Sequence, residues 1–242
     1  MSKEHVCVQG SALWLAARCG IPTSSCFHRI VTPKTRKRSA QLEPYAMDLT
    51  CERWTGRPLD NFTTAAMNDG TEREEQAVAS YELTRGVDTR MVGLITTDDG
   101  RYGASPDRMV IGGGLLECKN PKAHTHVAYL LGQGPESDYF CQLQGQLLVT
   151  GAPWVDIISC YPGMPDIVIR VEPDAEFMAT LRLLLNEVCD LVHMYMEKLK
   201  ASGYEPFSFE AEPVDDIGPF GISQADADRF MAAKFPKGAP IQ

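Results

Sequence analysis

Apolar and polar residues alternate along the chain with two different periods, which predicts a mixture of helices and strands. The helical period and its capping residues predict a short helix over 14–18 that ends at Gly20, and longer helices over 40–55, 68–84, 137–149 and 174–200. Short apolar runs between turn residues predict strands over 92–97, 102–104, 109–111, 115–119, 154–161 and 166–171. Helices before and after a central set of strands indicate an α/β fold with a mixed, mostly antiparallel sheet.

Length and composition narrow the class of protein. A chain of 242 residues fits one domain over 1–242, in which 205–242 is a C-terminal extension with several prolines. No apolar run approaches the roughly 20 residues that a membrane span needs, and the first ten residues lack the apolar core of a signal peptide. None of the eight cysteines forms a C-x-x-C pair, so a reduced cytoplasmic protein without zinc or an iron–sulfur cluster is expected.

The charge excludes one way of binding nucleic acid. A formal net charge of −9 argues against a protein that coats DNA through bulk positive charge. It leaves room for a nuclease, because acidic residues around metal ions add negative charge and DNA contact can be local. The basic run Lys34–Arg38 is either such a contact or an ordinary solvated loop.

Specific chemistry is indicated by the segment SPDRMVIGGGLLECKNPK, in which Asp107 is followed ten positions later by Glu117 and then by Lys119. The IGGG stretch predicts a hairpin turn that brings Asp107 near Glu117. Glu117 and Lys119 share one face of their strand, whereas Cys118 points the other way. Two carboxylates and the Cys118 carbonyl suit Mg²⁺, with Mn²⁺ as a substitute, and Lys119 could orient or deprotonate an attacking water.

This acid–acid–lysine spacing is typical of magnesium-dependent nucleases of the PD-(D/E)xK type. Taken alone it is more often surface decoration around a hairpin, because short motifs match by chance. Glu74 lies on a charged helix that is either a solvated face or the source of a third carboxylate. Gln142 and Gln146 share a helix face, and Gln144 lies away from them. The local pattern alone favours an ordinary amphipathic helix for these glutamines.

A third group lies near the N-terminus. Arg18 can contact a phosphate through two N–H groups, and a helix start at Thr23 to Ser25 offers further N–H donors to an anion. The alternative is a helix cap, at Thr23 or Ser24, next to a surface arginine.

Five elements in a fixed order carry a family resemblance. They are W-x3-R-x-G-x-x-T-x-S from Trp14 to Ser25, G-x3-E at 70–74, SPD at 105–107, ECK at 117–119 and the helix YFCQLQGQLLVTG. Over roughly residues 9–200 the chain resembles the lambda-type phage exonucleases, also called the YqaJ-type viral recombinase family.

The resemblance implies a restriction-endonuclease-like core and a Mg²⁺-dependent 5′-to-3′ exonuclease on double-stranded DNA. Such an enzyme releases 5′-mononucleotides and leaves 3′ single-stranded overhangs for phage-type recombination in a bacterial host cell. The resemblance further implies a single-strand annealing protein as partner and a ring-shaped homotrimer around the DNA.

The resemblance also assigns roles to individual residues. Metal binding falls to Asp107, Glu117, Glu74 and the Cys118 carbonyl, and Lys119 assists the attacking water. Among the glutamines, Gln142 and Gln144 match the helix beside the site. The 5′-phosphate pocket falls to Arg18, Thr23 and Ser25.

Two other functions remain open. The first is another PD-(D/E)xK nuclease, either an endonuclease or a Cas4-like enzyme, although the chain lacks the cysteine cluster of Cas4 and Arg18 favours attack at an end. The second is a catalytically inactive DNA-binding protein of the same fold, which the intact Asp107, Glu117 and Lys119 argue against.

Overall fold

The computed structural model describes the backbone of residues 2–59 and 64–206, and the side chains of the same ranges except 64–72. All of these described residues belong to one compact unit. The predicted C-terminal extension lies outside the described residues from position 207 onward.

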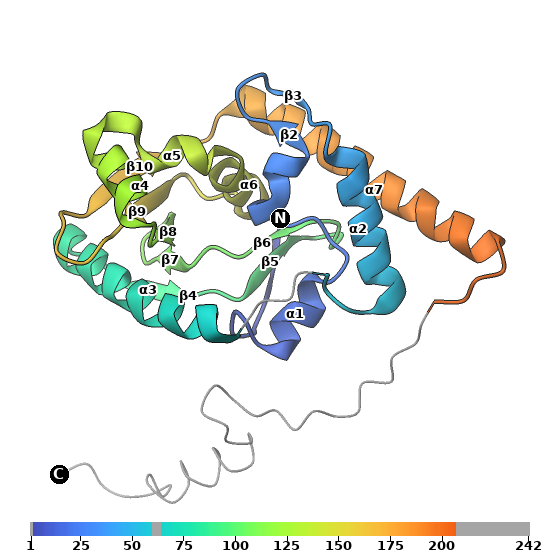
Figure 1. Cartoon of the computed structure of the whole chain (residues 1–242), viewed down its shortest axis with the longest axis horizontal. Helices are drawn as coiled ribbons and strands as arrows, with labels where there is room; N and C mark the ends of the chain where they lie inside the picture. Colours follow the sequence, from blue (N-terminus) through green and yellow to red (C-terminus); the bar gives the residue numbers. More distant parts are fainter. Residues whose placement is uncertain (1, 60–63, 207–242) are drawn as a thin grey trace, which may run out of the picture. The chain divides into compact units, whose positions relative to one another are not determined.

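The main sheet has five strands in the order β10-β9-β8-β7-β4 (Figure 1). The strands are β4 (Thr89–Met91), β7 (Arg108–Val110), β8 (Leu115–Lys119), β9 (Val155–Ser159) and β10 (Ile167–Val171). Strands β8 and β9 are parallel, and the other neighbouring pairs are antiparallel. The predicted mixed, mostly antiparallel sheet is therefore confirmed, although β4 was not predicted.

Two of the predicted strands belong to a separate sheet. Strands β5 (Leu94–Thr97) and β6 (Gly103–Ala104) pair with each other, and β5 also pairs with β1 (Ser2–His5) at the N-terminus. A short ribbon joins β2 (Val31–Thr32) to β3 (Lys37–Arg38). Strand β1 was not predicted, because its four residues SKEH are exposed or half-buried and show no apolar pattern.

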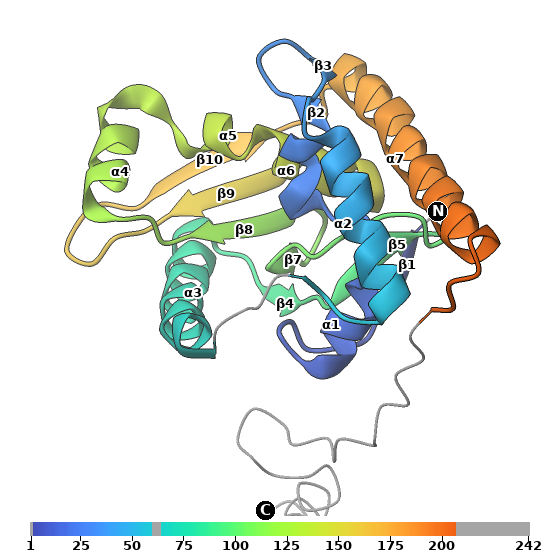
Figure 2. The same cartoon turned by 45° about the vertical axis from the view of Figure 1, so that its right-hand side comes forward.

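Helices cover both faces of the main sheet, as Figure 2 shows. Helix α3 (Thr64–Arg85) buries Ala77, Val78 and Tyr81 against the face that carries Leu116 and Ile158. Helix α6 (Phe140–Thr150) buries Leu143 and Leu147 against the opposite face, which carries Leu115 and Ile157. The alternation of residues along β8 and β9 thus supplies both halves of the core.

The remaining helices are α1 (Ala12–Arg18), η1 (Ser24–Arg29), α2 (Leu42–Thr55), α4 (Ala123–Ala128), η2 (Tyr129–Gln133), α5 (Pro135–Asp138) and α7 (Ala175–Ala201). The helix predicted over 137–149 begins only at Phe140, because Tyr139 (φ −105°, ψ 12°) separates it from α5. Helix α4 and the segment η2 were not predicted. In the described part of the chain, no helix is both long and apolar enough to cross a membrane.

Helix α6 packs closely on η1 through Gly145. A Cβ at this position would collide with the buried Phe27 ring and would lie 3.3 Å from the Cβ of Ser24. Because Phe27 is part of a packed core, the ring has little room to move away. Glycine therefore permits the approach of α6, which carries the glutamines, to the segment that follows Thr23.

Candidate active site

The predicted β7–β8 hairpin is confirmed, and it places Asp107 against the middle of β8. Arg108 pairs with Leu116, and Met109 pairs with Leu115. The turn has Gly114 at φ 95°, where a Cβ would also collide with the Trp154 indole, so glycine is required. Asp107 Oδ2 accepts a hydrogen bond of 2.7 Å from the N–H of Cys118, the residue after Glu117, which fixes this carboxylate against β8.

Glu117 accepts more side-chain hydrogen bonds than the other two candidate metal-binding carboxylates, Asp107 and Glu74, and is only 2% exposed. Its Oε1 accepts from Lys119 Nζ and from Gln142 Nε2, each at 2.5 Å. Its Oε2 accepts from Gln146 Nε2, also at 2.5 Å. Glu117 and Lys119 thus share a face as predicted, and Cys118 contributes its side chain to the core on the other face.

The glutamines divide between two sides of α6. Gln144, which the resemblance placed beside the site, instead donates to the Glu172 carbonyl and accepts from the Asp174 N–H, each at 2.8 Å. Residues two apart on a helix differ by about 200°, so Gln144 cannot share the face of Gln142. The prediction for Gln144 is wrong in its placement, and Gln146 takes that place. The spacing of four residues between Gln142 and Gln146 was the signal for it.

Glu74 is linked to the segment that carries Asp107 by hydrogen bonds from Arg108. Its Oε1 accepts from Arg108 Nη1 at 2.8 Å, and the same nitrogen donates to the Asp107 carbonyl at 2.8 Å. Arg108 is only 8% exposed and joins α3 to the start of β7. Sequence reasoning missed Arg108, because nothing in its local pattern distinguishes it from a surface arginine.

Burial and mutual repulsion set the electrostatics of this acidic cluster, defined as Glu74, Asp107 and Glu117. Burial, followed by the nearby Glu117 carboxylate, holds the pKa of Asp107 well above its usual range. Burial likewise raises the pKa of Glu74, although Arg108 offsets part of the effect. Burial acts to lower the pKa of Lys119, but Glu117 and Asp107 outweigh it and raise that pKa overall. Lys119 is therefore an ammonium at neutral pH.

The residues present fit a divalent cation with oxygen ligands. Asp107 and Glu74 have raised pKa values, through burial and in part because the Glu117 carboxylate lies near both, and a divalent cation among these acids relieves the repulsion. Among the side chains that the structure describes, no group of three or more His, Cys, Asp or Glu is placed so that it could hold a metal ion by itself. An open, oxygen-only set suits Mg²⁺, which keeps several waters and takes substrate oxygens. The ligand roles of Asp107, Glu117, Glu74 and the Cys118 carbonyl stay predictions.

Two of the three predicted phosphate-binding residues, Arg18 and Thr23, contact each other, and a hydrogen bond links their region to the segment that carries Asp107. Arg18 Nη2 donates to Thr23 Oγ1 at 3.0 Å, and the Arg18 guanidinium lies 4.2 Å from the centre of the Trp14 ring. Trp14 Nε1 donates to Ser105 Oγ at 2.9 Å, two residues before Asp107. Ser25 is exposed at the start of η1. Thr23 is the N-cap residue of η1, which is one of the two positions expected for the cap, but its side chain makes no capping hydrogen bond.

Arg18 and Thr23 line a small cavity of about 50 Å³. The same cavity is lined by Arg29, by the carboxylates Asp48 and Glu52, and by Tyr45. Arg29 pairs with Asp48 at 2.7 Å and lies over the Tyr45 ring at 4.6 Å. The cavity therefore combines guanidinium groups with acids that balance them.

The basic loop makes ion pairs within the chain. Arg36 pairs with Asp174 at 2.6 Å and Glu176 at 3.2 Å, and Arg38 pairs with Glu187 at 2.7 Å and Glu43 at 3.1 Å. These arginines bind the loop to α7 and α2. General DNA contact by Lys34–Arg38 stays a prediction.

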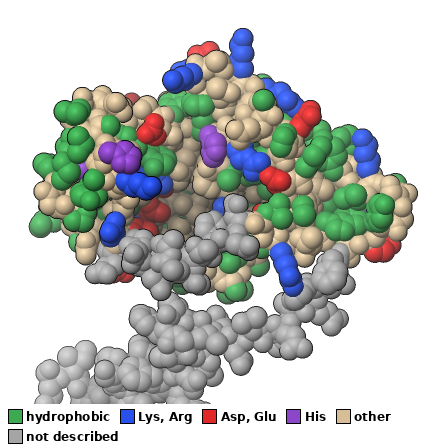
Figure 3. Space-filling model, viewed as in Figure 1, with side chains coloured by type: hydrophobic (Ala, Val, Ile, Leu, Met, Phe, Trp, Pro, Cys, Tyr) green, Lys and Arg blue, Asp and Glu red, His purple; other side chains and the backbone are tan. Residues whose placement is uncertain are grey.

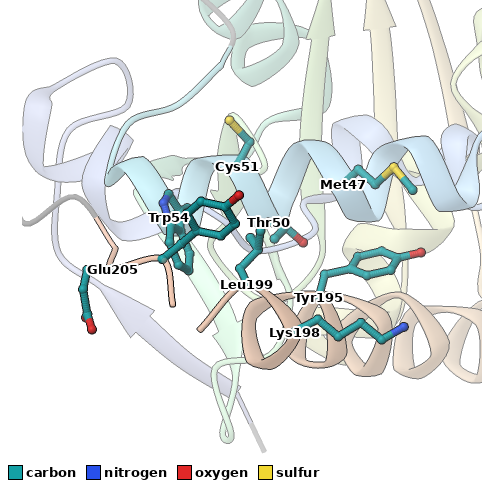
Figure 4. Close-up of a pocket in the computed structure, with 9 residues that line it drawn as sticks. Met47, Thr50, Cys51, Trp54, Tyr195, Lys198, Leu199 and Glu205 are labelled. Carbon is teal, nitrogen blue, oxygen red and sulfur yellow. The ribbon is translucent and has the colours of Figure 1, made fainter. Parts of the chain in front are cut away.

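The surface offers two further observations. The face in Figure 3 is hollowed near its centre, and acidic, basic and histidine side chains lie around the visible part of the hollow. Elsewhere, α2, the end of α7 and the residues just after it border an open, mostly apolar pocket of about 620 Å³ (Figure 4). None of the residues singled out from the sequence lines this pocket; its walls are Met47, Thr50, Cys51, Trp54, Tyr195, Lys198, Leu199, Tyr204 and Glu205.

Comparisons with known proteins define the class. The structure of an alkaline exonuclease, LHK-Exo from Laribacter hongkongensis, is similar with a TM-score of 0.70 and 30% identity, covering 79% of this chain and 97% of that chain. The structure of LHK-Exo with dAMP gives a TM-score of 0.70 and 31% identity over the same shares. A phage-related exonuclease from Haemophilus somnus 129PT, at 12% identity, has a TM-score of 0.59 over 74% of this chain and 96% of that chain, and shows a shared fold.

The fold is thus the restriction-endonuclease-like fold of exonucleases. The sequence matches the model of the YqaJ-like viral recombinase domain over residues 13–153, which is more than half of the chain. The chain belongs to the YqaJ-like viral recombinase family, as the sequence motifs predicted. No curated protein sequence matches the chain significantly.

Proposed function

We propose that the protein is a Mg²⁺-dependent 5′-to-3′ exonuclease on double-stranded DNA. It releases 5′-mononucleotides and leaves 3′ single-stranded overhangs for phage-type recombination. The observation that carries the proposal is the convergence of Asp107, Glu117 and Lys119 at one buried position in a chain of this family. Glu74 approaches the same position from α3.

In this proposal Asp107 and Glu117 hold the cation, with the Cys118 carbonyl and Glu74 as further ligands. Bound Mg²⁺, or Mn²⁺ in its place, supplies Lewis acidity toward a phosphodiester and lowers the pKa of a bound water. Lys119 donates from Nζ and is an ammonium at neutral pH, so it orients the water and offsets phosphate charge. Gln142 keeps the Glu117 carboxylate in place.

The 5′ direction rests on the group at the N-terminus. Arg18 and Thr23 meet in one cavity, and the Trp14–Ser105 hydrogen bond ties that region to the segment carrying Asp107. We assign the 5′-phosphate to Arg18 and Thr23, together with Ser25, which is exposed at the start of η1. LHK-Exo with dAMP supports a mononucleotide product, since a deoxynucleoside monophosphate is what exonucleolytic cleavage releases.

The proposed assembly is a homotrimer ring in the cytoplasm of a bacterial host, with a single-strand annealing protein as partner. A ring suits the net charge of −9, because only the lining of its channel has to be basic. Light scattering on the full chain tests this assembly: a trimer mass is expected, and a monomer would contradict it.

The test of the activity uses linear duplex DNA with and without a 5′-phosphate, and closed circular duplex, in Mg²⁺ and in EDTA. Cleavage of linear DNA only, with a preference for the 5′-phosphate and loss in EDTA, is expected. Cutting of closed circles would instead support an endonuclease, and DNA binding without any cutting would support an inactive protein of this fold. Lys119→Ala should bind DNA without cutting it, whereas the matched surface variant Lys200→Ala should cut normally.

A further inference from the structure

The glutamine face of α6 holds both oxygens of one carboxylate. Gln142 donates to Glu117 Oε1, and Gln146 donates to Glu117 Oε2, each at 2.5 Å. The two glutamines are one helical turn apart, so a single rigid helix presents both amides to the same group. Lys119 also contacts Oε1, but from a long side chain on β8 itself.

Gln146 is the more constrained of the two amides. It is fully buried, and helix α6 is anchored by Leu143 and Leu147 in the core under β8 and β9. The orientation of the amide is also fixed, because a flipped amide would place its oxygen against the Glu117 carboxylate. The direction of Glu117 Oε2 is therefore set by the packing of α6 and not by Lys119.

The oxygen of the Gln146 amide has no hydrogen-bond donor in the described part of the chain. This oxygen, Oε1, is buried. Buried amide oxygens are rarely left without a donor, since losing hydration without a replacement is unfavourable. This oxygen belongs to the same planar group as the nitrogen that contacts Glu117, so it lies beside that carboxylate.

We propose that Gln146 is a positioning residue of the metal site. With Gln142 it holds the Glu117 carboxylate in the orientation that binds the divalent cation, and its amide oxygen accepts a hydrogen bond from a water of that cation. The inference rests on the proposed function, because it takes Glu117 as a metal ligand. Partners of this kind orient ligands and typically change metal affinity when they are removed.

Helix α6 supplies its own matched control. Gln144 is as buried as Gln146 and makes two hydrogen bonds of 2.8 Å, but these go to the Glu172 carbonyl and the Asp174 N–H on the opposite side. Methionine has nearly the same length as glutamine and lacks the amide. Gln144→Met and Gln146→Met therefore remove equivalent groups from one helix, and only one of them touches Glu117.

The experiment measures Mg²⁺ and Mn²⁺ binding to the full chain by calorimetry without DNA, alongside the melting temperature and the Mg²⁺ dependence of cleavage. Gln146→Met should weaken cation binding on the order of 10-fold. It should raise the Mg²⁺ concentration for half-maximal cleavage by a similar factor, with a smaller loss of rate at saturating Mg²⁺. Gln144→Met should lower the melting temperature and leave the cation affinity unchanged.

The outcomes separate this inference from the proposed function. If the wild-type protein binds neither cation, there is no metal site, and both the proposed function and the role of Gln146 are contradicted. Wild-type binding with unchanged or tighter affinity in Gln146→Met would overturn only the role of Gln146. If Gln146→Met does not fold, Gln142→Met at the half-buried position replaces it, and an unchanged affinity there together with an unchanged affinity in Gln146→Asn overturns the proposal.

Discussion

Asp107 and Asp174 are the same residue type in opposite circumstances. Asp107 lies in the acidic cluster, where burial and Glu117 raise its pKa. Asp174 caps α7, where the Phe177 N–H at 3.0 Å, followed by Arg36, lowers its pKa. The ionised form is therefore favoured by folding at one position and disfavoured at the other.

The comparison separates an acid that stabilises the fold, Asp174, from an acid of the candidate site that destabilises it, Asp107. An N-cap acid satisfies a free N–H and the helix dipole, which contributes about 1 kcal/mol. Asp107 receives one N–H, from Cys118, and its burial beside the Glu117 carboxylate, which the nearby Lys119 offsets only in part, costs stability. A metal-free protein keeps such a cluster only because packing of β7, β8 and α3 enforces it.

The largest contrast is expected in cleavage. Asp107→Asn keeps an oxygen that can accept from the Cys118 N–H but removes the charge that holds the proposed cation. Cleavage of linear duplex in Mg²⁺ should fall on the order of 10³-fold, since metal catalysis contributes several kcal/mol. Asp174→Asn should retain its cleavage rate. A cleavage rate within a few-fold of wild type in Asp107→Asn would show that Asp107 does not take part in cleavage.

The second contrast is in the pH dependence of stability in EDTA. A carboxyl group with a raised native pKa binds its proton more tightly when folded. From its unfolded pKa near 4, up to the raised native value, the unfolding free energy of wild type therefore falls as pH rises. Asp107→Asn lacks the titrating carboxyl group. Over this pH range its unfolding free energy should therefore rise relative to that of wild type by up to about 1.4 kcal/mol per pH unit.

Denaturant unfolding at a series of pH values measures this difference. Asp174→Asn is the opposing control: its native pKa is lowered, so the wild-type advantage is present above about pH 4 and disappears as pH falls through the native value. Parallel pH profiles for the two variants would contradict the assigned electrostatics.

A smaller effect is expected from removing the Asp174 side chain, which caps α7 and pairs with Arg36. Asp174→Ala should lower the unfolding free energy by about 1 kcal/mol, because the Phe177 N–H loses its acceptor. Glu176→Ala removes the other, exposed partner of Arg36 and should cost less than about 0.5 kcal/mol. Denaturant unfolding at pH 7 checks both, and equal losses would contradict the larger contribution expected from Asp174.

Local patterns predicted those parts of the site that lie close in sequence. The β7–β8 hairpin followed from the IGGG turn, and strand alternation placed Glu117 and Lys119 on one face. Helical spacing grouped Gln142 with Gln146, whereas transferring a family pattern to Gln144 overrode that geometry and failed.

Contacts between distant segments could not be predicted in the same way. The Arg108–Glu74 pair spans 34 positions, and the Trp14–Ser105 hydrogen bond spans 91. Neither has a local signal, because each depends on how α3 or α1 docks on the sheets. The parallel pairing of β8 with β9 was likewise invisible, since it joins strands separated by α4 to α6.

The contact at Gly145 bears on the spacing within the proposed active site. Helix α6 carries the amides that contact Glu117, η1 directly follows Thr23, and Gly145 allows these two elements to approach closely. If Thr23 binds the 5′-phosphate and Glu117 binds the cation, as proposed, a larger side chain at position 145 would change the distance between these two sites and with it the length of the released product.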